Sequence, residues 1–203
     1  MLRALRRVSD RRRQANGEYG WLFNPYTGDE MVAIDCETTG LDTRRAELVS
    51  LAAVRLKGDR VLTSQSLDLR LARPASLSGD SIRIHRLRGI DLEGGDSIEA
   101  ALAKFLDFVG NRPLVGWCLE FDLVILNRYL RAHLGFELPN ARVEVSQAYA
   151  KALRRSRPEL IPNLRFEAVA EALEVPVMGR HTALGDAVTT ALMYTRVQRG
   201  LVG

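Results

Sequence analysis

The stretch AIDCETTGLD at residues 33–42 joins an apolar run, a pair of carboxylates and a turn. Residues 31–35 have the composition of a buried strand, and the Thr-Thr-Gly that follows is a turn signal. Side chains two positions apart on a strand point to the same face, so Asp35 and Glu37 lie side by side. Two neighbouring carboxylates repel each other unless a cation or a proton offsets their charge. The stretch therefore predicts a strand whose end carries two carboxylates that bind a cation or a proton.

Strand and helix patterns alternate along the rest of the chain. Residues 46–71 carry two β-rich arms joined at Lys57-Gly58-Asp59, which predicts a hairpin. We expect helices at 97–110, 122–134, 163–173 and 182–200, and short strands at 113–117 and 141–146. This order predicts an α/β fold, a mixed five-stranded sheet with helices on both faces. In such sheets ligands gather at the carboxyl ends of the parallel strands.

Two further acids lie at the ends or first turns of predicted elements. Asp122 follows the strand at 113–117, and Asp186 lies one turn into the last helix. Taken singly, Asp122 also fits a helix cap and Asp186 a solvated helical residue. Four converging carboxylates are costly without cations, and Mg²⁺ or Mn²⁺ prefers such hard oxygen ligands. Two ions about 4 Å apart stabilise the attacking and leaving oxygens in phosphodiester cleavage. A two-ion site is therefore expected.

His181 supplies a proton acceptor for that chemistry. It precedes Asp186 by five residues, which is about 140° away from the same helical face. We therefore expect His181 on a loop before the helix, within reach of a water molecule but not a metal ligand. A neutral imidazole near pH 7 accepts a proton from water, so His181 is the predicted general base.

The charge of the chain is concentrated at its N-terminus. Of the net +4, residues 1–16 contribute +5 through six arginines and one aspartate, which leaves −1 for the remainder. Residues 1–30 are therefore expected to form a basic N-terminal arm and an aromatic loop, ahead of a domain at 31–203. The arm fits a phosphate-binding segment, a solvated helix or an organelle transit peptide. The aromatic residues of 16–30 fit packing on the domain, or alternatively stacking with nucleic acid.

Other features exclude some classes of protein. No apolar run approaches the roughly 20 residues of a membrane span, and no apolar stretch of a secretory signal follows the arginines. Cys36 and Cys118 lie far apart without metal-type spacing, so both are expected as reduced thiols. We therefore expect a cytoplasmic protein with no membrane partner.

The ordered motifs DCETTGLD, EFDLVILN and HTALGDA resemble those of the DEDDh 3′–5′ exonucleases. This family includes the proofreading epsilon subunit of bacterial DNA polymerase III, ribonuclease T and oligoribonuclease. The resemblance spans residues 31 to about 197 and implies a ribonuclease H-like fold. It implies that two Mg²⁺ or Mn²⁺ ions are held by the four acids, and that His181 is the general base. In this sequence the four acids are Asp35, Glu37, Asp122 and Asp186.

The resemblance also implies contacts with the last nucleotide of a substrate. Thr38 and Leu41 match residues that meet the 3′-terminal nucleotide, and Phe121 lies directly before the acid of the second motif. His85 aligns with an Ile-His-Gly-Ile segment near the substrate, although Arg86 replaces its glycine, and His85 also fits a surface or packing role. In the second motif Cys118 stands where the family has asparagine, and Glu120 adds a negative charge near the entrance.

The expected function is a metal-dependent 3′–5′ exonuclease that releases nucleoside 5′-monophosphates from single-stranded or frayed ends. Its partner is nucleic acid with a free 3′ end, and DNA is favoured over RNA. The alternatives are an RNA-trimming exoribonuclease and a non-catalytic nucleic-acid-binding or polymerase-accessory module. Because the chain stops after the last helix, without the polymerase-binding tail of the epsilon subunit, we expect a free-standing nuclease. Monomer and homodimer both remain open.

Overall fold

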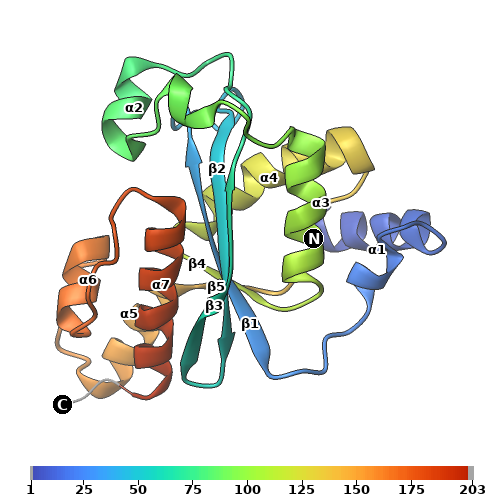
Figure 1. Cartoon of the computed structure of the whole chain (residues 1–203). Helices are drawn as coiled ribbons and strands as arrows, with labels where there is room; N and C mark the ends of the chain where they lie inside the picture. The colour runs from blue at the N-terminus through green and yellow to red at the C-terminus, as the bar shows by residue number, and fades with distance from the viewer. Residues whose placement is uncertain (1, 201–203) are drawn as a thin grey trace.

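A single five-stranded sheet forms the centre of the computed structural model, which describes residues 2–200 and their side chains from residue 5 (Figure 1). The strands lie in the order β3-β2-β1-β4-β5. Their bounds are Glu30–Thr38 for β1, Leu48–Lys57 for β2, Arg60–Arg70 for β3, Leu114–Gly116 for β4 and Arg142–Glu144 for β5. β1 pairs antiparallel with β2 and parallel with β4, and β4 pairs parallel with β5. The predicted mixed sheet is confirmed.

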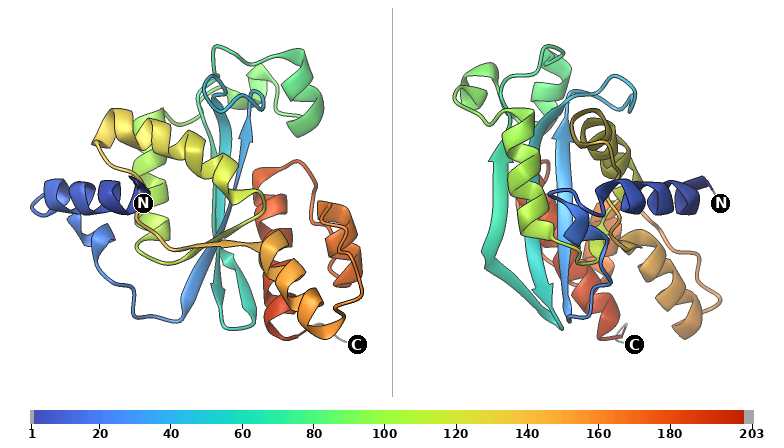
Figure 2. Two further views of the ribbon diagram at one scale, coloured as in Figure 1. Left: turned by 180° about the vertical axis from the view of Figure 1, so that it is seen from behind. Right: turned by 90° about the vertical axis from the view of Figure 1, so that its right-hand side faces the viewer.

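Helices cover both faces of this sheet, as predicted (Figures 1 and 2). α3 (Ile98–Val109) and α4 (Leu119–Leu134) pack on one face. α5 (Val145–Ser156), α6 (Phe166–Ala172) and α7 (Ala183–Gln198) pack on the other. Successive side chains of β1 point to opposite faces of the sheet, so β1 contributes to a hydrophobic core on each face. Ile34 and Cys36 face α3 and α4, whereas Ala33 faces α7. Asp35 and Glu37 therefore point toward α7.

The hairpin between β2 and β3 turns where the sequence places it. Lys57 pairs with Arg60, which leaves Gly58 and Asp59 as the two loop residues. Gly58 has a φ of 57°, a left-handed conformation that glycine adopts without a steric penalty.

Several elements were not predicted from the sequence. They are α2 (Gly79–His85), α5, and the 3-10 helices η1 (Gly20–Phe23) and η2 (Gly89–Leu92). The strand predicted at 141–146 is too long, because β5 ends at Glu144 and α5 begins at Val145. The Glu144 carboxylate accepts hydrogen bonds from the Ser146 hydroxyl at 2.7 Å and the Ser146 N–H at 3.3 Å. This side-chain cap starts a helix where the residue pattern favours a strand.

The N-terminal segment is a helix, α1 (Leu2–Gln14), that is attached to the domain. Asp10 is only 1% exposed, accepts the Glu137 N–H at 3.1 Å and forms an ion pair with Arg13. The Gln14 amide donates to the Leu134 carbonyl at 3.1 Å. Residues 5–14 therefore form a helix whose side chains are mostly exposed to solvent and which is held to the domain at Asp10 and Gln14.

The aromatic loop after α1 packs partly as expected. Leu22 and Phe23 are buried in the same core as α3 and α4, and the Tyr26 hydroxyl accepts the Glu30 N–H at 3.0 Å. Trp21 is more exposed to solvent than Leu22 and Phe23. The predicted arm and loop at 1–30 and the predicted domain at 31–203 both extend past the described residues. Residue 1 of the first and residues 201–203 of the second lie outside them.

Two simpler predictions concern the cysteines and membrane spans. Cys36 and Cys118 are both unpaired thiols, the first buried and the second exposed. Within residues 2–200, none of the helices combines the length and the apolar character needed to cross a membrane.

Candidate active site

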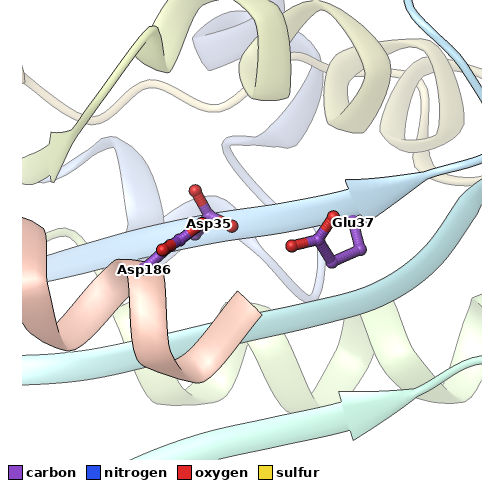
Figure 3. A group of neighbouring side chains, drawn as sticks. All are labelled: Asp35, Glu37 and Asp186. Carbon is purple, nitrogen blue, oxygen red and sulfur yellow. The ribbon is translucent and has the colours of Figure 1, made fainter. Parts of the chain in front are cut away.

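Three carboxylates meet where β1 passes the first turn of α7 (Figure 3). Asp35 and Glu37 lie opposite Ala52 and Ser50 of β2, and Asp186 lies in the first turn of α7. One oxygen from each of the three carboxylates lies within 4.8 Å of the others. The alternation of side chains along β1 thus places Asp35 and Glu37 on the face of the sheet that α7 covers, and α7 supplies Asp186.

Burial makes this cluster electrostatically costly. It raises the pKa of Asp35 well above its usual range, and the charges of Asp122 and Asp186 raise it further. Burial also raises the pKa of Glu37 to about 7, with a contribution from Asp186. The pKa of Asp186 is raised by burial as well. Because the charged forms are disfavoured, ionising all three carboxylates requires additional positive charge.

The oxygen atoms of this cluster suit a divalent metal ion. Asp186 Oδ1 is buried and has no hydrogen-bond partner among the described residues. The three residues that converge offer only carboxylate oxygens, the hard ligands that Mg²⁺ and Mn²⁺ prefer. An orphaned buried oxygen beside two other carboxylates therefore fits a cation as the missing partner.

Asp122, the fourth predicted acid, lies close by but outside the group of three. It is buried in the first turn of α4, on the side of β1 that carries Cys36. Burial raises the pKa of Asp122, and its hydrogen bonds with the Cys36 thiol and backbone act in the opposite direction. After burial, the charge of Asp122 is the largest cause that raises the pKa of Asp35.

The start of α4 is held by a residue that sequence reasoning did not identify. Cys118 has a left-handed φ of 53° and makes no side-chain cap. Instead, the Glu144 carboxylate accepts the Cys118 N–H at 3.2 Å and the Leu119 N–H at 2.8 Å. A carboxylate at a helix N-terminus satisfies free N–H groups and suits the helix dipole. Glu144 thus takes the place of an N-cap side chain and fixes the turn that carries Asp122.

His181 lies on the turn before α7, as predicted. Its φ is 62°, and its backbone N–H donates to Asp186 Oδ2 at 3.2 Å. A left-handed conformation is unfavourable for a residue with a side chain, so the surrounding contacts must hold it. The turn therefore keeps His181 next to a cluster acid without using its imidazole for that purpose.

Arg180 brings positive charge to this site, and no pattern in the sequence predicted it. Its Nη1 donates to Asp186 Oδ2, and its Nε donates to Glu167 at 2.8 Å. The guanidinium lies 4.2 Å from the centre of the Phe166 ring. Its charge lowers the pKa of Asp35, Glu37 and Asp186, which opposes the effect of burial.

Comparison with known proteins points in the same direction as this geometry. The family model described as exonuclease, of the RNase T type, matches residues 32–194. The chain belongs to this exonuclease family.

Its relatives include proteins named as DNA polymerase III or a subunit of it. The exonuclease is 32% identical to the DNA polymerase III epsilon subunit of Aquifex aeolicus, over 82% of this chain and 79% of that subunit. It is 28% identical to a PolC-type DNA polymerase III of Thermotoga maritima over 81% of this chain, which spans only 12% of that polymerase. The resemblance to epsilon-like exonucleases is confirmed.

Solved structures share the fold of this exonuclease. Cell-death related nuclease 4 matches with a TM-score of 0.74 at 14% identity, over 85% of this chain and 64% of that one. E. coli exonuclease I in complex with a dT13 oligonucleotide matches with a TM-score of 0.68 at 18% identity, over 84% and 41%. The ribonuclease H-like fold class is thereby confirmed.

Three predicted substrate contacts lie at or just beyond the ends of the elements that carry the acids. Leu41 is 87% exposed just beyond β1, and the Thr38 hydroxyl donates to the Gly40 carbonyl at 2.9 Å. Phe121 is partly buried against the core beside Asp122. Glu120, which sequence reasoning placed as a repulsive charge at the entrance, forms an ion pair with Arg142 at 2.9 Å.

His85 closes α2 and borders a cavity of about 440 Å³. It is only 2% exposed, so a surface role is excluded. Its Nδ1 accepts the Leu87 N–H at 3.0 Å, whereas Nε2 has no partner among the described residues. The cavity is also lined by Ser50, the neighbour of Glu37 across the sheet, and by Gly185. His85 therefore faces a space that begins beside the carboxylate cluster.

Proposed function

We propose that this protein is a metal-dependent 3′–5′ exonuclease that releases nucleoside 5′-monophosphates. One observation supports this most strongly: Asp35, Glu37 and Asp186 offer carboxylate oxygens within 4.8 Å of one another in a chain of the exonuclease family. Such a cluster matches the ligand chemistry of Mg²⁺ or Mn²⁺, and two ions are the number that phosphodiester hydrolysis uses in comparable sites.

Each acid has a role in this proposal. Asp35 would help to hold both ions, because the charges of Asp122 and Asp186 both act on its carboxyl and raise its pKa. Glu37 and Asp186 would help to hold one ion, and Asp122 would help to hold the second. When bound, the ions stabilise negative charge on the phosphate and make the attacking water more acidic.

His181 takes the proton from the attacking water. Its backbone bond to Asp186 holds residue 181 beside the cluster, and that bond leaves the imidazole free to act. A neutral imidazole is a suitable acceptor near pH 7. The leaving group is the 3′-oxygen of the preceding nucleotide, and the product carries a 5′-phosphate.

The last nucleotide is held by side chains around the cluster. Leu41 and Phe121 offer apolar surfaces for the sugar and base, and Thr38 directly follows Glu37 at the end of β1. His85 lines the neighbouring cavity, and its buried Nε2, which has no partner among the described residues, is the proposed contact on that side once a nucleotide is bound. Because paired bases must be separated before they reach such a site, single-stranded or frayed ends are preferred.

DNA is the favoured substrate. The relatives described above carry names of DNA polymerase III, and E. coli exonuclease I is solved with DNA oligonucleotides. The distinction from RNA depends on contacts with the 2′-hydroxyl, and a direct comparison of the two polymers measures it.

The test uses 5′-labelled single-stranded DNA and RNA of one sequence, with Mg²⁺, Mn²⁺ or EDTA. The wild-type protein should give a ladder of one-nucleotide steps that requires metal, and Asp186→Ala should abolish it. Asp59→Ala is the matched control, because Asp59 is exposed at the β2–β3 hairpin. A folded wild-type protein that binds both polymers without cutting would instead indicate a non-catalytic module, and faster cutting of RNA would indicate an exoribonuclease.

A further inference from the structure

Arg180 is held at three points between α6 and α7. Its Nε donates to Glu167 at 2.8 Å, its guanidinium lies 4.2 Å from the Phe166 ring centre, and Nη1 donates to Asp186. Glu167 and Phe166 belong to α6, whereas Asp186 is an acid of the carboxylate cluster. One arginine therefore connects an outer helix with a candidate metal-binding carboxylate.

The three attachments differ in kind. Glu167 is 62% exposed, so its ion pair with Arg180 is screened by solvent, and the contact with Phe166 is a cation–π interaction. The bond to Asp186 is the one made within the cluster, where the acid is 5% exposed. An ion of two positive charges at the same carboxylate meets the positive charge of the guanidinium at short range, and the two cations repel each other.

We propose that Arg180 is the internal counter-ion of the metal-free site and competes with the divalent ion for Asp186. This inference rests on the proposed metal-dependent function and concerns the regulation of that same site. In the metal-free protein, the guanidinium offsets the charge of the carboxylates. When metal binds, Arg180 releases Asp186 and remains attached to Glu167 and Phe166.

A different role for Arg180 would predict the opposite effect on metal affinity. If the arginine served to hold Asp186 in a favourable orientation for the ion, removing it would weaken metal binding, as the loss of an orienting partner does. The two roles therefore differ in sign, which makes the measured affinity decisive. Even with strong screening, repulsion from a neighbouring unit charge weakens the binding of a divalent ion by roughly tenfold or more. We therefore expect the competition to outweigh any orienting effect of Arg180.

The experiment is calorimetric titration of Mn²⁺ into the whole chain without nucleic acid. Arg180→Gln should tighten Mn²⁺ binding about tenfold or more, and Arg180→Lys, which keeps the charge, should stay near the wild-type value. Arg199→Gln is the matched control, because Arg199 forms an exposed ion pair with Asp59 away from the cluster. Unchanged or weaker Mn²⁺ binding by Arg180→Gln would overturn the inference.

A second pair of variants tests the inference if Arg180→Gln does not fold. Glu167→Gln removes the outer partner of Arg180 and should weaken Mn²⁺ binding, because the guanidinium then stays with Asp186. When Arg180→Lys is also present, Glu167→Gln should weaken Mn²⁺ binding less. Lysine lacks the planar fork with which arginine bonds the carboxylates of Glu167 and Asp186 together. Equal effects in the two backgrounds would contradict the competition.

The failure of this inference differs from a failure of the proposed function. A wild-type protein that binds no Mn²⁺, and shows no metal-dependent cleavage, would refute both. A wild-type protein that binds Mn²⁺ and loses this binding in Asp35→Asn, with no gain in Arg180→Gln, would refute only the role of Arg180.

Discussion

Gly185 lies directly against the carbonyl of Met178, so that a Cβ atom at position 185 would come within 1.9 Å of that oxygen. The Gly179 carbonyl would lie 2.4 Å away. The turn that carries Arg180 and His181 therefore packs on the first turn of α7 only because residue 185 has no side chain. Both atoms are backbone, so the clash cannot be relieved by a rotamer change.

Gly185→Ala should consequently displace this turn. We expect a loss of about 1–3 kcal/mol in the free energy of unfolding, typical of overpacking, and a loss of activity of about 10²-fold because His181 moves. Urea denaturation and the ladder assay measure the two effects. Gly79→Ala is the control, since no atom lies within 4 Å of a Cβ there. Normal activity in Gly185→Ala would show that the turn tolerates displacement.

His181→Ala should lower the cleavage rate by about 10²-fold or more while Mn²⁺ binding persists. The reason is that the imidazole accepts a proton and is not a ligand in the proposed site. Single-turnover kinetics and calorimetry separate the two properties. His133→Ala is a matched control, because His133 lies near the end of α4 beside Glu99. Near-normal cleavage without His181 would remove it from the role of base.

The stability of the metal-free protein should fall as the pH rises from about 4.5 to about 7. The pKa of Glu37 is raised to about 7 from 4.5, so the folded state binds more protons than the unfolded state in this window. The titration of Glu37 should lower the free energy of unfolding by roughly 3 kcal/mol across this range. Denaturation in EDTA across this range should show a smaller decline for Glu37→Gln than for the wild type. Parallel curves would mean that Glu37 titrates normally.

Glu144→Ala should destabilise the protein by about 1–2 kcal/mol, because two N–H groups at the start of α4 are left without their acceptor. Cleavage should fall as well, since the same turn positions Asp122. Thermal unfolding and the ladder assay provide the measurements. Glu159→Ala, on the exposed segment after α5, serves for comparison. A stability equal to that of the control would show that water replaces the carboxylate without a penalty.

The exposed arginines of α1 offer a test of the predicted phosphate-binding arm. Replacing Arg7, Arg11 and Arg12 with glutamine should weaken binding of single-stranded DNA at low salt. The slope of log affinity against log salt should become shallower by up to about 2, at roughly 0.7 for each phosphate that is no longer neutralised. Fluorescence anisotropy at several salt concentrations measures this slope. An unchanged slope would show that α1 does not touch the strand.

The sequence predicts the parts of this structure that depend on local patterns. The period of two along β1 places Asp35 and Glu37 on one face, and the five-residue spacing places His181 before α7, because both follow from regular backbone geometry. Arg180 and Glu144 were missed because they bond to residues 13 and 26 positions away, and no periodicity reports such contacts. Asp10 was missed for the same reason, since its partner Glu137 is distant in the sequence.

Trp117 gives this site an optical signal of its own. Its ring meets Phe166 edge to face at 5.2 Å, and Phe166 in turn carries the guanidinium of Arg180 on its surface. A movement of that guanidinium changes the surroundings of an indole one ring away. Because the second indole, Trp21, lies beside Gly110 at the end of α3 rather than near α7, a Trp21→Phe variant would isolate the emission of Trp117. The protein thus contains its own fluorophore for following the arginine in real time, without any label.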